Sequence, residues 1–69
     1  MDNDERFLRR QIRSAVKSNK TKFISELPDQ HVVMVEDEGV RRWRQGDMRG
    51  VDALKHALVF ARATFKRKG

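Results

Sequence analysis

The chain is poor in the residues that usually reinforce a small fold or build a reactive site. It has no cysteine, one proline and one tryptophan in 69 residues, which excludes disulfides and thiolate metal sites. Its longest apolar run, residues 57–61 (ALVFA), is far shorter than the roughly 18 residues of a membrane span. Residues 1–5 (MDNDE) are acidic, unlike a secretory leader. We therefore expect a cytoplasmic protein, of a bacterium or of a phage-infected cell.

The length of the chain limits the size of its core. Residues 1–69 are enough for one small domain, which buries a limited fraction of its surface. Because the chain lacks disulfides, its stability has to come from well-packed helices or from a second chain that completes the core.

Charge is abundant and is sorted into blocks. Sixteen Lys and Arg residues oppose ten Asp and Glu residues, which gives a formal net charge of +6. Residues 6–22 hold seven basic and no acidic side chains, residues 26–38 hold five acidic and no Lys or Arg, and basic residues return from position 41. A small chain with this pattern favours an anionic partner, and nucleic acid is the first candidate.

Apolar spacing predicts three helices. Residues 4–18 place Phe7, Leu8, Ile12, Ala15 and Val16 on one helical face. A short helix is expected over residues 21–27, ended by the chain's only proline. Residues 51–67 carry the strongest helical pattern, with an apolar arc broad enough to contact more than one neighbour.

The segment between these helices resembles a β-hairpin in composition. Residues 31–36 (HVVMVE) are rich in β-branched residues, residues 37–39 (DEG) can form a turn, and residues 40–45 can return as a second strand. The predicted fold class is therefore α+β: a small single domain ordered helix, short helix, β-hairpin, helix.

A basic stripe on the first helix is the leading candidate for nucleic-acid binding. Arg6, Arg10, Arg13 and Lys17 recur at intervals of four, three and four, and Arg9 lies beside them. Three helical turns span about 16 Å, which is enough to contact several phosphates. The alternative is an ordinary solvated helix face, although such faces usually mix charges of both signs.

The expected second strand supplies further candidates. Arg42 and Arg44 would share one face of that strand and could contact phosphate, whereas Arg41 and Trp43 would share the other. Trp43 could stack on a base, but the only tryptophan of a small domain is better explained as a core residue.

The remaining polar residues indicate neither catalysis nor metal binding. His31 and His56 form no zinc-binding or catalytic set. The acidic run at residues 36–38 lacks the spacing of a calcium loop and suits a charged hairpin tip. We expect no enzymatic activity, no metal site and no cofactor.

The sequence thus predicts a regulatory, non-enzymatic module that binds the phosphate backbone of DNA or RNA. The alternative partner is an acidic surface of another protein, which the chain would regulate or inhibit. A homodimer through the 51–67 helix is also possible, because core area is scarce. Residues 66–68 (KRK) either extend the binding surface or only complement the helix dipole. Attachment to an anionic membrane ranks low, since the first helix needs its apolar face for the core.

Overall fold

The computed structural model describes residues 2–46 and 48–66, and within these residues it contains four α-helices and no strand. The helices are α1 (Asp2–Lys17), α2 (Lys22–Ser25), α3 (Asp29–Arg44) and α4 (Gly50–Phe65). The three predicted helices are confirmed, with small shifts at their ends. The predicted hairpin, and with it the α+β fold class, is wrong: the chain is a small all-α bundle.

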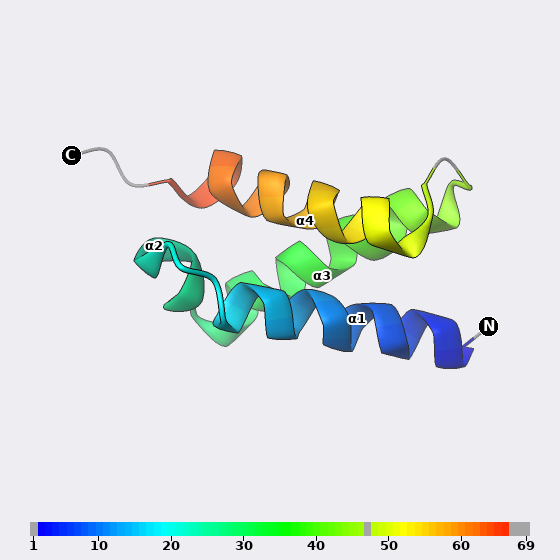
Figure 1. Ribbon diagram of the computed structural model, residues 1–69, viewed down its shortest axis with the longest axis horizontal. Helices are drawn as coiled ribbons and strands as arrows, with labels where there is room; N and C mark the ends of the chain where they lie inside the picture. The colour runs from blue at the N-terminus through cyan, green and yellow to red at the C-terminus, as the bar shows by residue number, and fades with distance from the viewer. Residues whose placement is uncertain (1, 47, 67–69) are drawn as a thin grey trace.

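The three long helices pack along one another (Figure 1). Helices α1 and α4 run in the same direction, and α3 runs in the opposite direction and contacts both. The short helix α2 contacts both α1 and α4 at the end of the bundle where these two helices finish. The arrangement is elongated, with extents of 40 × 19 × 19 Å.

Residues 31–45 form most of α3 rather than a hairpin because their apolar side chains follow helical spacing. Val32, Val35 and Val40 are buried, and Trp43 packs partly buried against the same core. These four residues are separated by three, five and three positions, and Gly39 lies within the interval of five. This spacing keeps the four side chains on one face of a helix. The β preference of valine is weaker than the gain from burying this face against two other helices.

The single proline and one glycine mark the two ends of α3. Pro28 precedes the first helical residue, where its fixed φ of −65° fits and its missing N–H is not needed. Its carbonyl accepts the backbone N–H groups of His31 and Val32 at 2.9 and 3.0 Å. Gly46 has a φ of +77° and ends the helix in the left-handed region that glycine tolerates best.

The core lies where α1, α3 and α4 meet. Its fully buried members come from all four helices: Ile12, Val16, Ile24, Val32, Val35, Ala53, Ala57 and Ala61. Gly39 lies at the closest point, since a Cβ built there would be 2.5 Å from Ile12 Cδ1 and 3.2 Å from Ala57 Cβ. This glycine, expected in a turn, instead lets α3 approach both of its neighbours in mid-helix.

The small residues of α4 are used inside the monomer. Ala53, Ala57 and Ala61 are fully buried against α1 and α3, so these small residues are not available for close approach of a second copy. Val51 and Val59 remain exposed on the outer side of α4. A homodimer through this helix stays a prediction.

None of the helices in the described ranges is long and apolar enough to cross a membrane.

Candidate nucleic-acid interface

The basic stripe of α1 is divided between two environments. The helix turns Leu8, Ile12 and Val16 into the core, which leaves the basic residues on its flank toward α3 or on its outer surface. Arg9 and Arg13 lie on the flank, whereas Arg6 and Arg10 are exposed on the outer surface.

The flank of α1 faces the acidic part of α3. Arg13 Nε donates a hydrogen bond to Glu36 Oε2 at 2.7 Å, and Glu36 is the one buried charged residue in the described ranges. Arg9 donates to Asp37 Oδ1 at 2.7 Å and lies 3.5 Å from Glu36 Oε1. Arg9 also pairs with Glu5 on its own helix. Glu36 and Asp37 of the predicted hairpin tip are therefore acidic partners of the basic stripe, whereas Glu38 of the same tip pairs with Arg41.

This pairing changes the acid–base properties of its members. The hydrogen bond to Asp37 is the main cause that raises the pKa of Arg9, against the opposing effect of burial, and Glu5 adds to the rise. The pKa of Glu5 is lowered chiefly by its hydrogen bond with Arg44 at the end of α3. These groups remain ionised at neutral pH and hold α1 against α3.

Lys17 stands between the two environments. Its Nζ lies 3.7 Å from Asp29 Oδ1, but the Asp29 side chain is 80% exposed. A pair this open to water is worth little free energy, so Lys17 remains available to an external anion.

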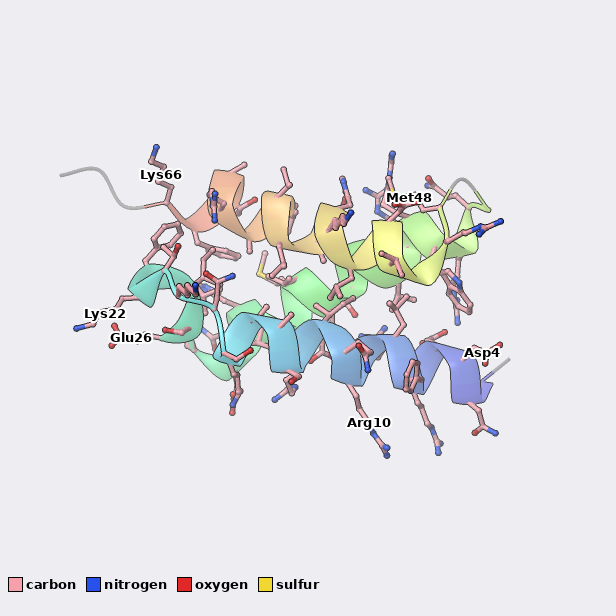
Figure 2. All side chains as sticks on the ribbon, in the orientation of Figure 1. Asp4, Arg10, Lys22, Glu26, Met48 and Lys66 are labelled. Atoms are coloured by element: carbon pink, nitrogen blue, oxygen red, sulfur yellow. The ribbon has the colours of Figure 1, made fainter. Side chains whose placement is uncertain are left out.

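Arg6 and Arg10 form no ion pair with any other residue that the structure describes. Figure 2 shows Arg10 pointing away from the bundle on the side of α1 remote from α4. With Lys17, these two side chains are the members of the predicted stripe that face solvent.

The arginines expected on the second strand do not share a face. Two residues apart on a helix, Arg42 and Arg44 are separated by about 200° around α3. Arg44 pairs with Glu5 of α1. Arg42 is partly buried, and its Nε is a buried donor without a hydrogen-bond partner in the described residues. The prediction that these two side chains share one face is wrong, whereas phosphate contact by either of them stays a prediction.

The expectation that Trp43 belongs to the core is confirmed, since it packs against the buried cluster. Arg41, predicted to share its strand face, is instead exposed and pairs with Glu38. His56 of α4 also bonds to Glu38, with 2.7 Å between His56 Nε2 and Glu38 Oε2. Burial raises the pKa of Glu38, but these two hydrogen bonds outweigh that effect and leave the pKa below its ordinary value.

A second group of basic side chains joins Lys66 of the predicted 66–68 cluster to two residues that were not predicted as part of a site. Lys55 and Arg62 of α4, and Lys66 directly after it, are exposed and, in the described ranges, form no ion pair. Their spacing of seven and four residues puts them on one side of the helix, a signal that the sequence already contained. In Figure 2, Lys66 points away from the bundle in the direction opposite to Arg10. The other two residues of the predicted 66–68 cluster lie outside the described residues.

Among the described residues, no group of three or more His, Asp or Glu side chains is placed to hold a metal ion. Comparison with known protein families, with curated proteins and with solved structures finds no match to this chain. The function is therefore inferred from the chain's own residues.

Proposed function

We propose that the chain is a non-enzymatic nucleic-acid-binding module, which uses the outer face of α1 to contact the phosphate backbone. The observation that carries the proposal is the pair Arg6 and Arg10, exposed one turn apart and unpaired within the described chain. Lys17, whose one contact is a long and exposed ion pair, extends this face by two further turns. A nucleic-acid ligand is consistent with the cytoplasmic location that we propose.

The inner arginines have a supporting role in this proposal. Arg9 and Arg13 are committed to carboxylates of α3, so they position α1 and add a positive potential behind the outer face. Their carboxylate partners cancel part of that potential. The contact surface is therefore smaller than the seven arginines and lysines predicted from the sequence, and binding should be of moderate affinity with little sequence preference.

The test is the salt dependence of binding, measured by fluorescence anisotropy with labelled duplex DNA and duplex RNA of mixed sequence. Affinity should fall steeply between roughly 50 and 200 mM salt, because each neutralised phosphate contributes about 0.9 to the slope of log K against log salt. The double variant Arg6→Gln, Arg10→Gln should reduce that slope by about 1.8.

A matched control loses the same charge elsewhere. Lys55→Gln with Arg62→Gln removes two exposed positive charges from α4 and should change the slope much less. Absence of binding at low salt, or equal effects of the two double variants, would contradict the proposed interface. If a specific protein from lysate stays bound after nuclease treatment while nucleic acid does not bind, an acidic protein surface replaces nucleic acid as the partner.

A further inference from the structure

Two of the long helices carry an exposed basic stripe of the same length. Each stripe has three members, separated by one interval of four residues and one of seven, and covers three helical turns, about 16 Å. The α1 stripe consists of Arg6, Arg10 and Lys17, and the α4 stripe consists of Lys55, Arg62 and Lys66, the last directly after the helix.

The six residues of the two stripes equal the formal excess of positive charge in number. The chain has sixteen Lys and Arg residues against ten Asp and Glu residues, so the ten basic residues outside the stripes are matched by the ten acids. Within the described ranges, five of the six stripe residues form no ion pair, and Lys17 has only its long, exposed pair with Asp29.

The α4 stripe has little acidic charge on its own helix. Asp52, three residues before Lys55, is the one acid of α4, and the residues from there to the end of the helix contain no other. Surface helices usually mix charges of both signs for pairing. A face that carries one sign over three turns instead suits a polyanion.

Both stripes face away from the core. Lys55 lies two residues before the buried Ala57, which puts the two side chains about 200° apart around α4. On α1, Arg6 and Arg10 stand in the same relation to the buried Leu8, which lies between them in the sequence. Because α1 and α4 pack against each other, their stripes open onto different sides of the bundle.

The picture of the side chains agrees with this arrangement. Figure 2 shows Arg10 pointing away from the bundle beneath α1 and Lys66 pointing away from it above α4. The bundle between them measures 19 Å in each of its short directions. A short duplex is a rigid rod, because its length is far below the persistence length of about 150 base pairs. One duplex therefore cannot bend around the bundle to reach both stripes.

We propose that the chain bridges two nucleic-acid duplexes, one held by the α1 stripe and the other by the α4 stripe. This inference rests on the function proposed for the outer face of α1 and adds a second ligand on the opposite side. The α1 stripe is the tighter site, since it has two arginines, which bind phosphate in bidentate fashion. The α4 stripe has one arginine, and Asp52 lies close to Lys55. Affinity for a single duplex is therefore set mainly by α1.

Other occupants suit the α4 stripe less well. Val51 and Val59 are exposed on the same side of α4, but two valines eight residues apart do not make the continuous apolar surface that a protein or a membrane usually covers. A second copy of the chain, with its net charge of +6, would bring like charge to the stripe.

The test is the capture of one duplex by another. A mixed-sequence duplex of about 20 base pairs, short enough to stay straight, is tethered to beads, and an identical fluorescent duplex is left free in solution. At about 50 mM salt the parent chain should retain the fluorescent duplex on the beads, and about 200 mM salt should release it. Fluorescence anisotropy with one duplex is measured in parallel, because it reports binding without bridging.

The deciding variant is Lys55→Gln with Arg62→Gln. It should largely keep the affinity for a single duplex, and it should reduce capture at least about tenfold, because two phosphate contacts are lost from the α4 stripe. The matched control is Lys22→Gln with Arg49→Gln. It removes one lysine and one arginine that are exposed, lie outside both stripes and form no ion pair in the described ranges, and it should keep the capture shown by the parent.

The outcomes separate this inference from the function on which it rests. Binding of a single duplex without capture of a second overturns bridging and leaves the proposed function standing, whereas no binding at low salt contradicts both. Undiminished capture by the Lys55→Gln, Arg62→Gln variant overturns the role of the α4 stripe and indicates a dimer that uses two α1 stripes. Equal losses in this variant and in the Lys22→Gln, Arg49→Gln control overturn it too, since net charge alone would then explain the capture.

Discussion

Arg13 Nε and Glu36 Oε2 lie 2.7 Å apart, in a hydrogen bond that joins α1 to α3 across 23 positions of sequence. The bond shows that the basic block at residues 6–22 and the acidic block at residues 26–38 pair with each other in the folded chain. It also limits function, because an arginine held by a nearly buried carboxylate is less available to an outside phosphate.

Loss of the Glu36 carboxylate should destabilise the bundle. Glu36→Ala removes the closest partner of Arg13 and one partner of Arg9, and hydrogen bonds to charged groups contribute about 2 kcal/mol each. For a chain of this size, a loss of about 2 kcal/mol in the free energy of unfolding lowers the Tm by about 10 °C. Thermal denaturation followed by circular dichroism measures it. Asp37→Ala removes a carboxylate whose side chain is 59% exposed and should cost under about 1 kcal/mol. Equal losses of stability in the Glu36 and Asp37 variants would contradict the larger contribution assigned to Glu36.

Enlarging Gly39 should strain the point where the helices meet. Gly39→Ala improves helix propensity by about 1 kcal/mol, but the new Cβ overlaps Ile12 and crowds Ala57, and overpacking costs about 1–3 kcal/mol. We expect a net loss of about 1 kcal/mol in urea denaturation. Ile12→Val removes the overlapping Cδ1 atom, so it should be less harmful, or even stabilising, in the Gly39→Ala background. If the effects of Gly39→Ala and Ile12→Val on the free energy of unfolding were strictly additive, a contact between these two positions would be excluded.

Freeing Arg9 should strengthen binding to nucleic acid. Asp37→Asn removes the closest of the three carboxylates around the Arg9 guanidinium, which weakens the hold of α3 on this arginine and lets it reach a phosphate beside Arg6 and Arg10. The slope of log K against log salt should rise by about 0.9 in magnitude, the value of one further phosphate contact. Asp52→Asn produces the same net charge on α4 and serves as the control. A similar rise in both variants would mean that net charge alone controls binding.

Acid should destabilise the bundle partly through Glu38. Its pKa is lowered in the folded state from the ordinary 4.5 by hydrogen bonds from His56 and Arg41, despite the opposing effect of burial. The ionised carboxylate therefore contributes its full stability above pH 4.5 and loses it as the pH falls through the lower folded-state pKa. Glu38→Gln should unfold more readily at pH 7 and should lose less stability between pH 5 and pH 3. If the free energy of unfolding of the parent and of the variant changed in parallel with pH, a contribution of Glu38 to acid sensitivity would be excluded.

The sequence alone was sufficient to predict the helices whose apolar residues form one uninterrupted face. In α1 the spacing of Leu8, Ile12 and Val16 identified both the helix and its core side. In α3 two signals competed, because valine composition indicated a strand while the spacing of Val32, Val35 and Val40 indicated a helix. Spacing was the better guide, since it reports which residues can be buried together.

Other features depended on contacts that no local pattern contains. Gly39 looked like a turn residue, and only its approach to Ile12 and Ala57 explains its place inside a helix. The basic stripe was located correctly on α1, but the loss of Arg9 and Arg13 to internal pairs depends on where α3 packs. The exposure of Phe7 was not expected, because its spacing placed it on the apolar face of the first helix.

The absence of a side chain at Gly39 also sets the alignment of the three long helices along their axes. A slide of α3 by one turn would bring Val35 or Trp43 to the position where even a Cβ overlaps Ile12, so the helices have a single register. Trp43 lies one turn from this point and is therefore held at a constant depth below Phe7 and Val51. The hollow of about 360 Å³ that Phe7, Trp43 and Val51 line between α1 and α4 is in this way shaped by a glycine that does not line it.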